Sequence, residues 1–344
     1  MTHALARPLP PDGSRPPPAA PADRAYARGY RAPSALRPVL RAAHRTRLIT
    51  TVATACADHA SIPLLALAAA WPGWWSGPGR AVAGVLVALF AAVLTGRQLR
   101  ALECLVHEAS HFNWSRSHRR ANDRLAAVLA GVPTGQRIAR YRAEHLLHHS
   151  RLGSQDDPDL RRYAELDVAG LDRSGPLAYG RTLLVRLVAH QRSWYRTTAT
   201  DLFGLLLPVL WALLTVAAPA AWRFGPGPAL VAGSVWLTGH LLVLPVLRFI
   251  GESSEHSYHD AVTVFDSTIT NRGVLQRWLI HPHSDGYHTV HHLWPGAPHH
   301  RLRRLHEQLS RADPEGYARR LRVRRRVLDE PSPRRPAARN TPCA

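Results

Sequence analysis

Residues 202–247 read LFGLLLPVLWALLTVAAPAAWRFGPGPALVAGSVWLTGHLLVLPVL, and this stretch decides the class of the fold. Its one arginine, Arg223, stands in a Gly/Pro-rich turn between two uncharged segments, residues 202–222 and 225–247. An α-helix needs about 20 apolar residues to cross the hydrocarbon core of a bilayer. The sequence therefore predicts two membrane-spanning helices joined by a short turn.

Two more apolar segments precede this stretch. Residues 48–71 form a third candidate span, interrupted only by Asp58 and His59, and residues 81–95 form a fourth, which we expect to continue as helix through Cys104. The connection between them, WPGWWSGPG, again combines Gly and Pro with tryptophans, which favour the membrane interface. We therefore predict an all-α integral membrane protein with four transmembrane helices in two hairpins.

The charge distribution predicts the orientation. The chain has 44 basic residues, all of them arginine, against 24 acidic ones, but the two Trp-rich connections hold only Arg80 and Arg223. Because basic residues accumulate on the cytoplasmic side, we expect both termini and the histidine motifs described below to lie on the cytoplasmic face of the cytoplasmic membrane. Attraction to anionic membrane lipid accounts for the remaining charge. The arginines lack base-reading motifs, so no nucleic-acid partner is expected.

Composition also divides the chain. Residues 1–40 are rich in Pro and Arg and predict a disordered arm, residues 41–330 a membrane domain, and residues 331–344 a disordered tail. The three cysteines stand at unrelated spacings, which excludes a disulfide scaffold and a thiolate metal site.

Eight of the 21 histidines fall in three short motifs, HEASH, HLLHH and HTVHH. They are His107 and His111, then His145, His148 and His149, then His288, His291 and His292. On a helix, residues at i, i+3 and i+4 share a face, so each motif presents its imidazoles together. Imidazole suits iron, copper, zinc and nickel, and the sequence therefore predicts a metal site built from histidine.

HEASH also fits HExxH, in which two histidines bind zinc and the glutamate is a general base. A zinc hydrolase needs only three protein ligands, so this remote alternative, a membrane protease, leaves most of the clustered histidines unexplained. A non-enzymatic metal or lipid binder is a further alternative. We expect Glu108 to accept a hydrogen bond from a ligand's free ring N–H instead.

Three longer segments resemble the membrane-bound fatty acid desaturase and hydroxylase superfamily, and its bacterial members in particular. They are HEASHFNWSRSHRRANDRLAAVLAGVP, YRAEHLLHHSRLGSQDDPD and YHTVHHLWPGAPHHRLRRLHEQL. The resemblance covers roughly residues 41–309. It implies a mushroom-shaped fold, with four membrane helices capped by a cytosolic helical domain that holds two iron ions.

By this resemblance, the eight histidines are iron ligands, and His256 in GESSEHSYHD is a ninth. Glu252 departs from the family, because some members have Asn at its place. Glu252 is a candidate to bind iron, to hold a water or to hydrogen-bond to a ligand. The aspartates that follow the second motif are candidates to hydrogen-bond to a ligand, with helix capping or pairing with arginine as the alternative. Those aspartates are Asp156, Asp157 and Asp159.

The resemblance implies an O2-dependent fatty acyl desaturase. A hydroxylase with the same ligands and a desaturase of a specialised small molecule are the alternatives. Candidate aromatic residues for a substrate slot are Trp194, Tyr195, Trp236 and Phe249. The chain has no HPGG-type cytochrome b5 segment, no Cys-rich ferredoxin segment and no G-x-G-x-x-G motif, so we expect a separate ferredoxin or similar carrier with its reductase.

Overall fold

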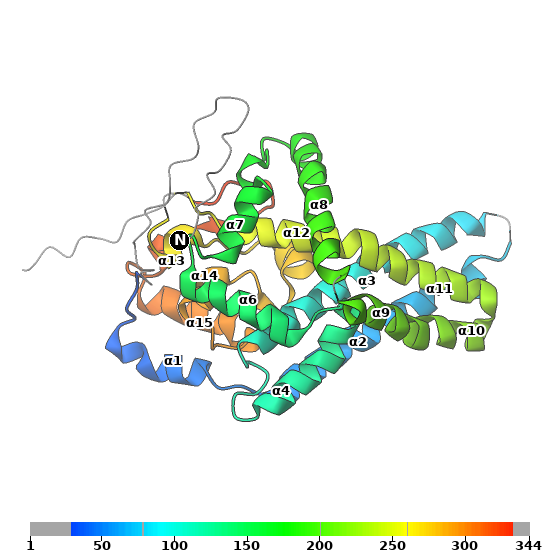
Figure 1. Cartoon of the computed structure of the whole chain (residues 1–344), viewed down its shortest axis with the longest axis horizontal. Helices are drawn as coiled ribbons and strands as arrows, with labels where there is room; N and C mark the ends of the chain where they lie inside the picture. Colours follow the sequence, from blue (N-terminus) through cyan, green and yellow to red (C-terminus); the bar gives the residue numbers. More distant parts are fainter. Residues whose placement is uncertain (1–28, 78, 200, 260, 333–344) are drawn as a thin grey trace, which may run out of the picture.

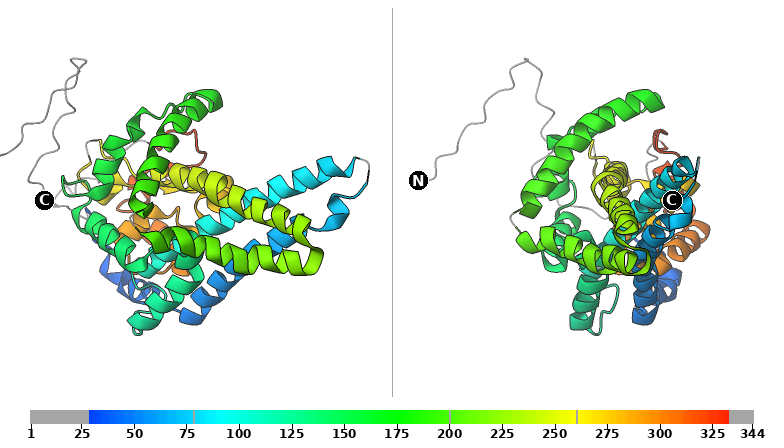
Figure 2. Two further views of the ribbon diagram at one scale, coloured as in Figure 1. Left: turned by 45° about the vertical axis from the view of Figure 1, so that its right-hand side comes forward. Right: turned by 90° about the vertical axis from the view of Figure 1, so that its right-hand side faces the viewer.

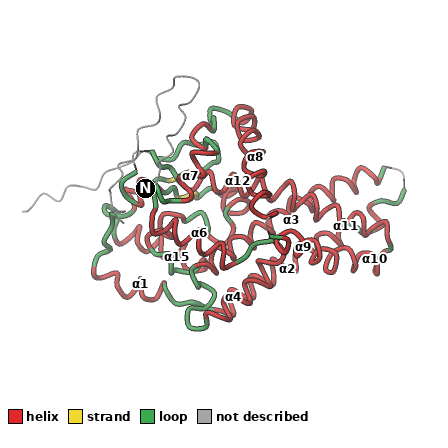
Figure 3. The backbone as a smooth tube through the Cα atoms, viewed as in Figure 1, coloured by secondary structure: helices red, strands yellow, loops and turns green. Residues whose placement is uncertain are grey.

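The computed structural model describes residues 29–77, 79–199, 201–259 and 261–332, and it is mostly helical with almost no strand (Figures 1 and 3). The helices are α1 (Arg37–Ala43), α2 (Leu48–Ala69), α3 (Arg80–Ser110), α4 (Arg119–Ala126), α5 (Val132–Thr134), α6 (Ile138–Arg151), α7 (Pro158–Glu165), α8 (Pro176–Ala199), α9 (Leu202–Ala212), α10 (Ala218–Phe224), α11 (Pro226–Thr238), α12 (Leu244–Glu255), α13 (Val264–Ser267), α14 (His288–Leu293) and α15 (His299–Ala312). Two-residue strands, β1 (Thr270–Asn271) and β2 (Val323–Arg324), pair in parallel.

Within the described residues, four helices are long and apolar enough to cross a membrane: Leu48–Ala69, Arg80–Ser110, Gly204–Phe224 and Pro226–Glu255. The last two run through π-helical turns that join α9 to α10 and α11 to α12. These are the four predicted spans, although the second and fourth extend further toward the histidine motifs than the apolar pattern indicated. In Figures 1 and 2 they run alongside one another and project from one end of the molecule.

The polar residues that interrupt α2 are paired inside the protein. Asp58 Oδ2 lies 2.6 Å from His283 Nε2, and His59 Nε2 accepts a hydrogen bond of 2.8 Å from the Trp211 indole. A buried polar group is costly unless it is hydrogen-bonded, so these contacts make both residues compatible with a membrane helix.

Small residues let the fourth long helix approach α3 closely. A Cβ atom added at Gly96 would lie 2.5 Å from Val243 Cβ, and one added at Gly239 would lie 2.8 Å from Thr95 Cγ2. Close approach of backbones at small residues is a principal source of packing between membrane helices. This contact therefore fixes the start of α12 against α3, and these two helices carry or precede several of the histidines.

The shorter helices gather at the end opposite the projecting spans (Figure 1). There α14 and α15 share an apolar core that includes Val290, Leu293, Leu302 and Leu305. The paired strands β1 and β2 tie the segment before α14 to the segment after α15.

The predicted disordered arm differs from the structure at its end. Residues 1–28 lie outside the described residues, but the ring of Tyr30 packs with Phe265, Trp294 and Tyr317 at centroid distances of 5.8 Å. Its hydroxyl also donates to Asp313 Oδ2 at 2.7 Å. One aromatic anchor orders the segment before α1 although the composition around it is polar and Pro-rich.

The predicted tail lies largely outside the described residues as well. Only residues 331 and 332 of it are described. The Ser332 N–H donates to the carbonyl of Val323 in β2 at 3.0 Å.

Candidate metal centre

Four segments bring the candidate histidines to one place. His107 lies on the last turn of α3, and His111 directly follows that helix. The second motif lies on α6 and the third on the six-residue helix α14. His256 ends α12 in an extended conformation and forms an antiparallel bridge with Thr268. All nine histidines expected to bind metal therefore lie in two adjoining groups.

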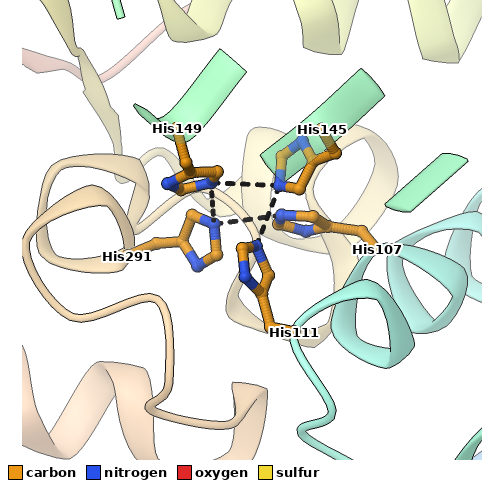
Figure 4. A group of neighbouring side chains, drawn as sticks. All are labelled: His107, His111, His145, His149 and His291. Carbon is orange, nitrogen blue, oxygen red and sulfur yellow. Dashed lines mark hydrogen bonds between the residues drawn. The ribbon is translucent and has the colours of Figure 1, made fainter. Parts of the chain in front are cut away.

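The first group contains five histidines whose ligand nitrogens lie within 4.8 Å of one another (Figure 4). They are His107, His111, His145, His149 and His291. His145 Nε2 lies 2.9 Å from His111 Nε2 and 3.0 Å from His149 Nε2. His291 Nε2 lies 3.0 Å from His107 Nε2 and 3.1 Å from His149 Nε2. The five Nε2 atoms thus converge on a common centre.

The second group lies beside the first. His148, His256 and His292 have ligand nitrogens within 4.8 Å of one another. His288 Nε2 lies 2.8 Å from His256 Nε2 and 3.1 Å from His292 Nε2, which adds a fourth imidazole. The rings of His149 and His292 stack at a centroid distance of 4.2 Å and so connect the two groups.

Hydrogen bonds between the imidazoles cannot account for all of these short Nε2–Nε2 distances. Each imidazole nitrogen has one in-plane position, which carries either a hydrogen or a lone pair. His145, His149 and His291 each direct Nε2 at two other Nε2 atoms, so one hydrogen cannot serve both neighbours. Cations that accept several lone pairs at once suit both groups, and an all-imidazole donor set fits iron, copper, zinc or nickel.

Burial keeps most of these imidazoles neutral, as a metal ligand must be. It lowers the pKa of His145, His149 and His291 well below the ordinary value, and the neighbouring imidazoles lower it further. The same cause, with His148 nearby, lowers the pKa of His256 to about 3. Their lone pairs are therefore available at neutral pH.

Two of the three candidate aspartates contact a histidine of the centre. His148 Nδ1 lies 2.9 Å from Asp157 Oδ1 and 3.5 Å from Asp159 Oδ2. Burial favours the neutral ring of His148, but the carboxylates of Asp159 and Asp157 outweigh it and raise the pKa. His148 Nε2 is buried without a hydrogen-bond partner among the described residues, so its lone pair is free for a metal. Asp156 is exposed instead.

The two candidate glutamates, Glu108 and Glu252, form their hydrogen bonds with groups other than the rings of the nine candidate ligands. Glu108 Oε2 accepts a 2.6 Å hydrogen bond from the His299 backbone N–H, so it caps α15 in place of the expected ring contact. This engagement also argues against a general-base role in an HExxH hydrolase. Glu252 Oε2 lies 2.9 Å from His190 Nε2 and 3.5 Å from an Arg162 nitrogen, and Glu252 is in neither histidine group.

Sequence reasoning missed Asp285. Its Oδ1 lies 3.3 Å from His107 Nδ1, the nitrogen on the far side of the ring from the centre, and its Oδ2 accepts from Arg100 at 2.8 Å. His281 was assigned no role from the sequence. Its Nδ1 lies 3.6 Å from Asp285 Oδ2 and 3.3 Å from Glu255 Oε1. The position of Asp285 three residues before the third motif is the only sequence feature that could have drawn attention to it.

A cavity of about 460 Å³ adjoins the centre. Five of the nine histidines contribute to its wall, namely His107, His145, His148, His256 and His288. Trp194 and Phe249, two of the aromatic residues proposed for a substrate slot, line it, whereas Tyr195 and Trp236 do not. The site can therefore hold a small molecule directly beside bound metal.

Comparison with known proteins agrees with this geometry. Residues 81–324 match the family model described as fatty acid desaturase. The chain is similar to dihydrorhizobitoxine desaturase of Bradyrhizobium elkanii, with 26% identity over 277 residues, which cover 76% of this chain and 75% of that protein. It is also similar to beta-carotene ketolase of a Paracoccus species, with 25% identity over 201 residues, which cover 58% of this chain and 70% of the ketolase.

Proposed function

Since this chain belongs to the fatty acid desaturase family, we propose that it is a membrane-bound, O2-dependent oxidoreductase that uses two iron ions to convert a CH–CH unit into a C=C bond. The observation that carries the proposal is the convergence of nine imidazoles in two adjoining groups. The five-histidine group would hold one ion, and the group of His148, His256, His288 and His292 would hold the other.

The cofactor would supply the step that side chains cannot perform. When bound, two ferrous ions support reduction of O2 and removal of hydrogen from an unactivated C–H bond. The chain's own residues keep the ligands ready for this. Asp157 and Asp285 lie at the Nδ1 atoms of His148 and His107 and can accept the Nδ1–H, so that Nε2 of each ring would be the atom that binds the metal. The ring of Tyr141 stacks on His145 at a centroid distance of 5.3 Å, and both residues line the cavity.

Oxygenation is the second candidate reaction. One relative is named a desaturase and the other a ketolase, at 26% and 25% identity, so both reactions have comparable support from the comparisons.

The expected partners and orientation are part of the proposal. A separate ferredoxin-like carrier and its reductase would deliver electrons at the cytoplasmic face, where the excess of arginine attracts an acidic protein. Reduction by such a carrier should slow as ionic strength rises, and a rate independent of salt would argue against electrostatic docking.

Mass spectrometry tests the reaction. Lipid and small-molecule extracts of aerobic cells that express the protein with an electron-transfer chain are compared with those of His291→Ala. His118→Ala serves as a matched control, because His118 is exposed and outside both groups. We expect a new species about two mass units lighter than its precursor in the wild type and control, and none in His291→Ala. A species about 16 units heavier would instead establish hydroxylation, and one about 14 units heavier would establish conversion of a CH2 group to C=O.

A further inference from the structure

The cavity beside the histidines has a mixed wall, which bears on what it can bind. Five arginines and six acidic residues line it, together with two tyrosines, a tryptophan, a phenylalanine, a proline, a leucine and a valine. A long acyl chain needs a wholly apolar wall, because polar groups buried against hydrocarbon lose their hydrogen bonds. This mixed wall suits a short molecule with a polar head.

One buried carboxylate organises two of the lining residues. Glu103 on α3 accepts from Arg248 Nε at 2.9 Å and from Gln136 Nε2 at 2.9 Å, both at Oε1. Arg248 Nη2 also donates to it. Glu103 and Arg248 are only 4% and 3% exposed, so this ion pair is fixed inside the protein. The contact with a carboxylate also assigns the Gln136 amide, since only its NH2 can donate there.

Arg248 and Gln136 each retain one buried atom without a hydrogen-bond partner among the described residues. These atoms are Arg248 Nη1 and Gln136 Oε1, and both residues line the cavity. The Arg248 guanidinium also lies 4.7 Å from the centroid of the Trp194 ring, which restrains its plane. A buried polar group without a hydrogen bond is costly. Arg248 Nη1 as donor and Gln136 Oε1 as acceptor are therefore candidates to bind the polar atoms of a ligand.

The position of this pair limits the size of the ligand. Glu103 precedes His107 by four residues on α3, about 6 Å along the helix axis. A molecule held by Arg248 and Gln136 would place its carbons beside the metal within a few bonds of its polar head. Because Glu103 neutralises Arg248, this ion pair has no net charge to attract a polyanionic carrier.

We propose that Arg248 and Gln136, oriented by Glu103, bind the polar head of a short substrate, a head in which a carbonyl or carboxylate oxygen lies next to an N–H donor. Arg248 Nη1 donates to the oxygen, and Gln136 Oε1 accepts from the N–H. Primary amides and α-amino acids share this chemistry. The inference deepens the proposed function, and rests on it, by assigning the substrate class of the same site.

Calorimetric titration of the iron-loaded protein in lipid nanodiscs, without O2, tests this assignment. The probes share a six-carbon chain: hexanamide, norleucine and methyl hexanoate, the last of which lacks the donor. We expect hexanamide or norleucine to bind about tenfold more tightly than methyl hexanoate, as one added hydrogen bond allows. The better of the two distinguishes a neutral head from a zwitterionic one. Stearamide should bind no better than hexanamide.

Variants connect the preference to the named atoms. Gln136→Met removes the acceptor at similar volume and should abolish the preference for the N–H donor. Gln191→Met is the matched control, since Gln191 also has an unpartnered Oε1 but does not line the cavity. The double variant Glu103→Gln/Arg248→Met removes the ion pair without leaving a buried charge alone, and should also lose the preference.

The outcomes separate this inference from the proposed function. Equal binding of all three short probes, absence of binding by them, or tight binding of stearamide that Gln136→Met leaves unchanged would overturn the head-group assignment. Those results leave iron content and product formation untouched. Conversely, a protein that selects hexanamide or norleucine but takes up no iron and forms no product would retain the binding site and refute the oxidoreductase.

Discussion

At the scale of single residues, one carboxylate lies at the Nδ1 atom of each of two candidate ligands, Asp157 at His148 and Asp285 at His107. Asp157 holds His148 at 2.9 Å, and it also accepts from the backbone N–H groups of Gly153 and Asp159. Its contact with His148 lowers the pKa of Asp157 against the opposing effect of burial. The carboxylate is therefore charged and fixed, and it orients the imidazole before any metal arrives.

Asp157→Asn should weaken metal binding. The amide keeps the size and an acceptor oxygen but loses the charge that supports the Nδ1–H, and loss of such a partner typically weakens affinity or activity by about 10- to 100-fold. Competition with a chelator on the purified protein measures the change. Asp156→Asn, at the exposed neighbour, should behave as wild type. Equal iron retention in both variants would show that the carboxylate of Asp157 does not support metal binding by His148.

At the scale of helices, the sequence predicted local features well and tertiary contacts poorly. The spacing of the histidine motifs correctly indicated shared helix faces, because i, i+3 and i+4 positions are a property of any helix. His256 came only from a family resemblance, since a single histidine has no spacing to read. Glu103 contacts Gln136, 33 residues along the chain, and Arg248, 145 residues along the chain. A local sequence pattern cannot predict contacts between residues so far apart.

The approach of α3 to the fourth span makes a second prediction. Gly96→Ala should destabilise the protein by about 1–3 kcal/mol, because the new Cβ would lie 2.5 Å from the Val243 side chain. Gly233→Ala, on α11 of the fourth span, is the control, since a Cβ there meets no atom of the described residues within 4 Å. Thermal unfolding in detergent measures both. A Gly96→Ala midpoint equal to that of the control would show that the two helices are not packed this closely.

In the whole molecule, the four apolar helices project from one end, and shorter helices and loops gather at the other (Figure 2). The apolar lengths predicted the four spans because bilayer thickness fixes the length of a helix that crosses it. The order of the residues around Tyr30 escaped prediction, since a single aromatic side chain in a Pro/Arg-rich segment forms its contacts with residues far along the chain.

The arginine distribution predicts the sidedness of the protein, and this prediction can be tested directly. In a variant without the native cysteines, Ser76→Cys reports on a Trp-rich connection and Ser117→Cys on the segment after the first histidine motif; both serines are exposed. A membrane-impermeant maleimide applied outside intact spheroplasts should label position 76 and leave position 117 until the cells are lysed. Labelling of position 117 from outside would reverse the orientation.

Metal analysis of the protein purified without O2 tests the central claim most directly. Two histidine groups predict about two iron atoms per chain, and His291→Ala together with His292→Ala should empty both positions while the protein remains folded. His118→Ala should retain the full iron content. One zinc per chain, or folded wild-type protein without bound iron after growth in iron-rich medium, would contradict the account.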